Sequence, residues 1–277
     1  MRILVYTECD VVTCVALNRL LPALSGHTVA VAVLRLGPVD LSSGSPLRVS
    51  DWYEREEIPR RVLAPLEEGP GLPGGLLPFG RLARACGVRL LDLDPADPVG
   101  VDRVAAGFAP DVILSLRFGL IFREPTLSLP PLGILNTHSG ALPEYPGLSA
   151  YAHTLLDGHS KLTCTLHRVD AGIDTGAVVA SRSLPFDPDR SVLWHLPQLY
   201  SLGAEMFLDL LPQLALGRRP VAVPQDRARR RYHREMTPAL AAVLEERGIR
   251  FVDTRDVDDL CAFFTGRSGN GTASRCR

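Results

Sequence analysis

Apolar and polar positions alternate in a regular way over the first 36 residues. Residues 2–6 (RILVY) and 27–36 (HTVAVAVLRL) are short apolar runs rich in β-branched side chains, which is typical of buried strands. Between them, residues 11–24 place apolar side chains along a broad helical stripe. Strand, helix and strand in such close succession predict a parallel α/β sheet.

The same alternation resumes further along the chain. It predicts strands over residues 88–94, 111–117, 133–139, 161–169 and 177–186, and helices over 102–108, 147–156 and 189–216. Asp189 or Ser191 is the expected cap of the last helix. The Pro-, Gly- and Ser-rich residues 37–80 predict long loops with one short helix.

From about residue 220 the composition changes. A basic cluster at Arg227–Arg231 precedes a short helix capped by Thr237, and residues 249–264 predict a strand and a helix. We therefore expect three parts: a main domain over 1–216, a small C-terminal α/β extension over 217–265, and a disordered tail over 266–277.

Composition narrows the possible partners. A net charge of −1 gives no electrostatic reason to expect nucleic acid or an anionic membrane as a partner. No apolar run approaches the length of a membrane span, and the N-terminal apolar run is too short for a signal peptide. The six cysteines contain no C-x-x-C pair, so we expect no metal site and a reducing, cytoplasmic location.

Two polar clusters lie where predicted strands end. Asn136 and His138 close the strand in GILNTHSGALPEYPG, and Asp174 lies in the loop of RVDAGIDTGAVV. In open α/β sheets, ligands bind beyond the carboxyl ends of the strands. Each residue taken alone also has a structural explanation, because Asn and Asp satisfy backbone groups in turns and most histidines have no catalytic role.

The order PDVILSLRFGLIF, GILNTHSGALPEYPG, LTCTLHRVDAGIDTGAVV resembles the 10-formyltetrahydrofolate-dependent formyltransferases. The resemblance is strongest over residues 110–179 and extends over 1–216, which would be the catalytic domain. It implies a Rossmann-like formyltransferase fold with a central, mostly parallel sheet. It also implies Asn136, His138 and Asp174 as catalytic residues, and 10-formyltetrahydrofolate as formyl donor without a metal.

The residue types fit this chemistry. Attack of an amine on the formyl carbon gives a tetrahedral intermediate with a negative oxygen, to which Asn136 and His138 can donate hydrogen bonds. A carboxylate at Asp174 is expected to favour protonated His138. It can also receive the proton of the amine.

The resemblance further implies a folate site. The pterin would lie against a short segment, bound through backbone groups, and the loop holding Asp170 and Gly172 would close over it. The segment consists of Phe118, Gly119, Leu120, Ile121 and Phe122. Ser139, Tyr145 and Tyr151 are candidates for the acceptor side, and His167 is expected to have a supporting or packing role.

Departures from the family restrict the acceptor. Members that formylate initiator tRNA carry a C-terminal barrel, for which the residues after Pro224 leave no room. Members that formylate glycinamide ribonucleotide have a glycine-rich phosphate loop after the first strand, where this chain has Glu8 and Asp10. Formyl-folate hydrolases have a domain ahead of the catalytic one, whereas the first predicted strand here begins at residue 2, so we do not expect hydrolysis. Pro146 stands where the family commonly has an arginine, which leaves the acceptor-side or structural role of that arginine unfilled.

The sequence therefore favours an N-formyltransferase acting on a small amine in specialised or natural-product metabolism. One alternative is a nucleotide-linked amino-sugar N-formyltransferase, for which Arg227–Tyr232 would hold the anionic part. A dinucleotide-dependent oxidoreductase is a third, although no G-x-G-x-x-G follows a predicted strand. The oligomeric state, a homodimer included, stays open.

Overall fold

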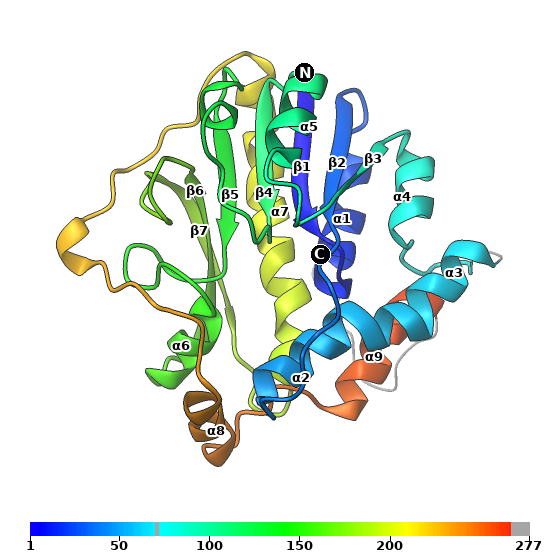
Figure 1. Cartoon of the computed structure of the whole chain (residues 1–277), viewed down its shortest axis with the longest axis vertical. Coiled ribbons are helices and arrows are strands. Elements are labelled where there is room, and N and C mark those ends of the chain that lie inside the picture. The colour runs from blue at the N-terminus through cyan, green and yellow to red at the C-terminus, as the bar shows by residue number, and fades with distance from the viewer. Residues whose placement is uncertain (70–71, 267–277) are drawn as a thin grey trace.

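The computed structural model of the chain describes residues 1–69 and 72–266, and a seven-stranded sheet forms the centre of this part (Figure 1). The strand order is β3-β2-β1-β4-β5-β6-β7. The strands are β1 Arg2–Glu8, β2 Thr28–Leu34, β3 Arg89–Leu93, β4 Val112–Leu116, β5 Ile134–His138, β6 Lys161–Arg168 and β7 Val178–Pro185. β1 to β5 pair in parallel, and β6 pairs antiparallel with both of its neighbours, β5 and β7. The predicted mostly parallel sheet is confirmed.

Helices cover both faces of the sheet. The α-helices outside residues 46–68 are α1 Val11–Ala23, α4 Phe79–Cys86, α5 Gly100–Phe108, α6 Ala150–Leu156, α7 Val192–Ala215, α8 Pro238–Glu246 and α9 Thr254–Thr265. α1 and α7 pack together on one face, over Ile3 and Val5 of β1. α5 lies on the other face with Leu4 and Tyr6, so the alternating residues of β1 are buried on both sides. None of the described helices is both long and apolar enough to cross a bilayer.

The prediction of loops over residues 37–80 was wrong for residues 46–68. Residues 46–68 form consecutive helical turns rather than loops: α2 Pro46–Trp52, the π-helical segments Tyr53–Glu57 and Pro59–Leu63, and α3 Ala64–Glu68. Pro46 lies in the first turn of α2, where the missing N–H costs little, whereas Pro59 and Pro65 follow helical residues within the same run of turns. The apolar side chains of Leu47, Ile58 and Val62 are buried in the core, so tertiary packing outweighs local propensity.

The predicted strand at residues 249–253 is also absent, so the extension is helical rather than α/β. The carbonyls of Arg250 and Phe251 instead accept from the N–H groups of Val192 and Leu193, at 2.8 and 3.0 Å. These are the first two residues of α7, whose N–H groups lack partners within the helix. The segment therefore completes a helix end and pairs with no strand.

Other helix ends agree with the sequence. Ser191 is the N-cap of α7, and the Thr237 side chain accepts from Leu240 N at the start of α8, as predicted. Of the expected tail, Gly266 follows α9, and residues 267–277 lie outside the described residues.

Residues 217–237, here called the strap, connect α7 to α8. Figure 1 shows this segment running along the β6–β7 side of the molecule from the end of α7 to α8. Val223 exchanges backbone hydrogen bonds with Val178 of β7, and His233 pairs with the segment around Gly147. The strap therefore contacts the chain near both of the polar clusters.

Candidate active site

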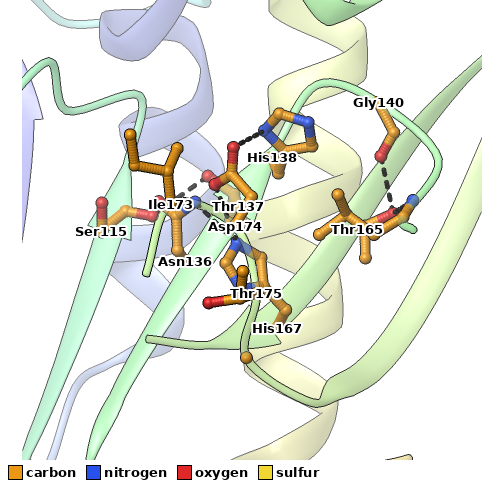
Figure 2. A network of polar contacts seen from close by, with 12 residues as sticks. Ser115, Asn136, Thr137, His138, Gly140, Thr165, His167, Ile173, Asp174 and Thr175 are labelled. Carbon is orange, nitrogen blue, oxygen red and sulfur yellow. Dashed lines mark hydrogen bonds and ion pairs between the residues drawn. The ribbon is translucent and has the colours of Figure 1, made fainter. Parts of the chain in front are cut away.

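A cleft of about 510 Å³ opens at the carboxyl ends of β1, β4 and β5. Asn136 and His138 line it from β5, and Asp174 reaches it from the β6–β7 loop. Figure 2 shows these three side chains pointing toward one another, with His167 of β6 beside them. The three residues predicted to be catalytic are therefore brought together.

His167 orients the Asn136 amide. Its Nδ1 lies 2.8 Å from the carbonyl of Arg168, which can only accept, so Nδ1 carries the proton in the neutral ring. Nε2 is then an acceptor, 3.0 Å from Asn136 Nδ2. One amide N–H is used in this contact, and the second stays available to the cleft. The sequence placed His167 in a supporting role but could not show which residue it supports.

The ring of His138 is held in one tautomer. Nε2 lies 2.5 Å from the Tyr145 carbonyl, to which it donates, and Nδ1 lies 3.6 Å from Asp174 Oδ2. Burial lowers the pKa of His138 below its ordinary value, and this effect outweighs the opposing charge of Asp174. The Asp174 carboxylate favours the protonated ring, as expected, but burial is the larger effect. The neutral ring presents an unprotonated Nδ1 to the cleft.

Asp174 is an ionised carboxylate in a strained backbone position. Burial acts to raise its pKa, but His167 and His138 and the Gly147 N–H lower it to about 2. The Gly147 N–H donates to Oδ2 at 2.8 Å, and Oδ1 lies 3.5 Å from His167. Its φ of 51° is unusual for a residue other than glycine and needs support from its surroundings.

The strap supplies that support. Gln225 Nε2 donates to the carbonyl of Asp174 at 2.9 Å and to that of Gly176 at 2.6 Å. Arg230 donates to the carbonyl of Ile173 at 2.9 Å. Sequence reasoning missed Gln225, because nothing in the local sequence of the strap indicates which loop it contacts.

The predicted folate segment borders the same cleft, with all five of its residues in the lining. Phe118 and Phe122 pack on the ring of Tyr6 at 5.1 and 5.2 Å between centroids. Asp170 and Gly172 also line the cleft, and Asp170 Oδ1 accepts from Gly172 N at 3.0 Å.

Two of the three residues predicted for the acceptor side lie in the cleft, and one does not. Ser139 and Tyr151 line the cleft. Tyr145 does not: its hydroxyl donates to Asp157 at 2.8 Å, its ring stacks on His233, and it contributes to the site only the carbonyl that holds His138.

A largely buried arginine that the sequence did not single out lies in the same cleft. Arg117 follows β4, and its Nε lies 3.0 Å from Asp10 Oδ2. It also pairs with buried Glu54 and lies over the ring of Tyr200. Asp10 in turn accepts from Thr13 N at 2.7 Å, so a carboxylate of the chain already occupies the N-terminus of α1.

The basic cluster of the strap lies beside the folate loop. Arg227 and Arg230 line a shallow hollow of about 500 Å³ together with Asp170 and Gly172. Arg229 pairs with Glu144 outside this hollow. Within residues 1–69 and 72–266, no three His, Cys, Asp or Glu side chains are grouped so as to hold a metal ion.

Comparison with known proteins gives a consistent result. Residues 94–197 match the model of the family described as formyl transferase. The methionyl-tRNA formyltransferase of Roseiflexus sp. (strain RS-1) is 32% identical over 170 residues, which are 61% of this chain and 52% of the relative. That of Nitrosococcus oceani is 34% identical over 152 residues, 52% of this chain and 47% of the relative. The chain spans about half the length of the curated relatives it matches.

Solved structures share the fold. The glycinamide ribonucleotide transformylase 1 of Symbiobacterium toebii has a TM-score of 0.54 at 20% identity, covering 82% of this chain and 94% of its own. The N-formyltransferase of Helicobacter canadensis, solved with folinic acid and dTDP-3-aminofucose, has a TM-score of 0.55 at 16% identity, covering 92% and 82%. Residues 94–197, which match the formyl transferase model, hold Asn136, His138 and Asp174, in agreement with the resemblance stated from the sequence.

Proposed function

We propose that the protein is an N-formyltransferase that moves the formyl group of 10-formyltetrahydrofolate to the amine of a small acceptor. The observation that carries this proposal is the convergence of Asn136, His138 and Asp174 on one cleft, which the apolar segment 118–122 also lines. The matched formyl transferase segment supports the reaction type. The acceptor is a separate question, because relatives in this family differ in what they formylate.

Asn136 stabilises the negative oxygen of the tetrahedral intermediate. With one amide N–H held on His167, the second N–H points into the cleft and is available to the oxyanion. A donor fixed in advance needs no reorganisation when the charge develops. Loss of such a donor typically lowers the rate on the order of 10²–10³-fold.

His138 acts as the base. The attacking amine becomes positively charged as its nitrogen bonds to the formyl carbon, and the unprotonated Nδ1 of His138 takes its proton. Protonated His138 then pairs with Asp174, whose carboxylate is ionised. Return of that proton to N10 lets the C–N10 bond break, which releases tetrahydrofolate and the formylated acceptor. Asp174 thus stabilises the intermediate charge on the ring.

The folate lies between the segment 118–122 and the loop of Asp170 and Gly172. The apolar side chains of this segment and its backbone N–H and C=O groups suit a pterin, which has flat apolar faces and a polar edge. The Asp174 loop then covers the formyl group.

Two alternative acceptors have specific support. A nucleotide-linked amino sugar is favoured by the fold shared with the Helicobacter canadensis enzyme and by the Arg227–Arg230 hollow. Methionyl-tRNA is favoured by the matched relatives. A phosphate at the end of β1 is disfavoured, because the Asp10 carboxylate already accepts from the N–H at the N-terminus of α1.

Folate binding and acceptor use can be tested separately. We expect 5-formyltetrahydrofolate to raise the melting temperature, and tetrahydrofolate release to require an added amine. The acceptor panel should contain small amines, nucleotide-linked amino sugars and methionyl-tRNA. His138→Ala and Asp174→Asn should abolish most turnover, whereas Asp92→Asn, at an exposed site on β3, should not. Near wild-type turnover in either active-site variant would refute the assignment.

The pH dependence tests the role of His138. Because a base must be unprotonated and burial lowers the pKa of His138, activity per neutral amine should fall only below pH 6.5. Asp174→Asn removes the anion that favours the charged ring, so the residual activity should fall at a still lower pH. An acid limb above pH 6.5 would contradict a buried neutral base.

A further inference from the structure

The carboxylate of Glu8, at the end of β1, lines the cleft without a partner. It makes no ion pair or side-chain hydrogen bond with any residue in the described part of the chain. Its Oε1 lies so close to Gly119 that a Cβ there would approach it to 2.7 Å. Glycine at this position therefore leaves room for the carboxylate beside the segment 118–122.

Most other charges on this side of the cleft are already paired. The pairs are Arg48 with Asp51 and Glu235, and Arg117 with Asp10 and Glu54. Arg55 donates to the Gly37 carbonyl. Arg117 and Arg55 act on the Glu8 carboxylate from a distance, but neither forms an ion pair or a hydrogen bond with it. An unpaired carboxylate in a largely buried position is costly, and a cation supplied by a ligand offsets that cost.

The sheet register places Glu8 in line with the reacting groups. Thr7 pairs with Leu116 and Leu116 with Thr137, so the residues that follow share one row across three strands. Strands lie about 4.8 Å apart, so the backbone of Glu8 is about 10 Å from that of His138. Arg117 is the middle residue of this row and is paired with Asp10 and Glu54, and all three residues of the row line the cleft, so one small molecule in the cleft can reach both Glu8 and His138.

We propose that the acceptor carries a second cationic group, an ammonium or a guanidinium, that binds the Glu8 carboxylate while its reactive amine faces His138 and Asp174. This inference rests on the proposed function and names its substrate class: a small dibasic amine, not a phosphorylated or nucleotide-linked one. Glu8 determines specificity and takes no part in the transfer itself. The two nitrogens of the acceptor are separated by roughly 5–10 Å, as the strand spacing requires.

Matched acceptors test this directly. Tetrahydrofolate release should be measured with 1,4-diaminobutane, 1,5-diaminopentane and butylamine, on wild type, Glu8→Gln and Glu235→Gln. Wild type should prefer the diamines in kcat/KM on the order of 10²-fold, as expected for a desolvated charge pair. Glu8→Gln should bring the ratio close to 1, mainly through KM. Glu235 lines the same cleft but is half exposed and paired with Arg48, so Glu235→Gln should keep the preference.

Folate binding separates the two levels of the proposal. If wild type binds 5-formyltetrahydrofolate and Glu8→Gln keeps the diamine preference, this inference is overturned and the formyl transfer stands. If wild type binds no 5-formyltetrahydrofolate, the proposed function falls and this inference with it. Glu8→Asp, which retracts the carboxylate by one methylene, provides a second variant: an intermediate diamine preference supports the contact, and a wild-type preference opposes it.

Discussion

Replacing Glu8 by Gln should stabilise the unliganded protein at alkaline pH and leave its stability nearly unchanged near pH 4.5. Burial is the main cause that raises the pKa of this carboxyl, from 4.5 to about 7. Between these values the folded state holds more protons than the unfolded state, so the free energy of unfolding falls as the pH rises. Above pH 7, this difference between the folded and unfolded pKa of Glu8 lowers the free energy of unfolding by about 3 kcal/mol. Partial exposure of Glu8 reduces this, and we expect about 1–3 kcal/mol.

Urea unfolding at pH 4.5 and pH 8 measures the effect. Gln has nearly the shape of a protonated Glu. The effect of Glu8→Gln on the free energy of unfolding at pH 8 minus its effect at pH 4.5 therefore measures the charge of Glu8, because packing contributes equally at both pH values. Glu235→Gln removes an exposed, paired carboxylate of the same cleft and should change stability by no more than about 0.5 kcal/mol. If Glu8→Gln alters stability equally at both pH values, the Glu8 carboxylate is well solvated and the reasoning fails.

Three other perturbations have defined outcomes. His167→Phe removes the acceptor that holds the Asn136 amide, so kcat should fall about 10-fold while the acceptor KM stays within about 2-fold in steady-state assays. Gln225→Ala removes the hydrogen bonds to the carbonyls of Asp174 and Gly176, so hydrogen exchange in that loop should become faster and kcat should fall about 10-fold. The control Gln198→Ala removes an exposed amide on α7 and should change neither quantity. Phe251→Ala should lower the free energy of unfolding by about 3–5 kcal/mol in urea titrations, because this ring is 1% exposed.

The sequence predicted the sheet from local signals, and it predicted the three catalytic side chains from the resemblance to the formyltransferases. Each apolar strand is bounded by polar or glycine-rich residues. Asn136 and His138 lie at the carboxyl end of β5, whereas β6 is antiparallel and Asp174 reaches the cleft from the loop that follows it. The Pro-, Gly- and Ser-rich composition of residues 37–80 predicted loops, but burial of residues 46–68 keeps that segment helical. Residues 249–253 have the composition of a strand, yet their carbonyls bind α7.

The roles of the other site residues could not be predicted, because they depend on tertiary contacts. The tautomer of His138 follows from the Tyr145 carbonyl, and its lowered pKa follows from burial that outweighs a nearby carboxylate. Glu8 stands out only because its neighbours are paired with other residues, which no local pattern records. Gln225 is distant in sequence from the loop it holds.

The carbonyls of Arg250 and Phe251, which bind the N–H groups at the start of α7, have a consequence for biosynthesis. During translation α7 leaves the ribosome well before Phe251, so the N–H groups of Val192 and Leu193 have no protein acceptor in that interval. Trp194, whose ring packs on Phe263 in the folded chain, is uncovered over the same period. The helix that carries Tyr200 into the cleft therefore reaches its final state late. A nascent chain arrested before residue 249 should be a good client for chaperones that bind exposed apolar segments, and it should lose that affinity once α9 has emerged.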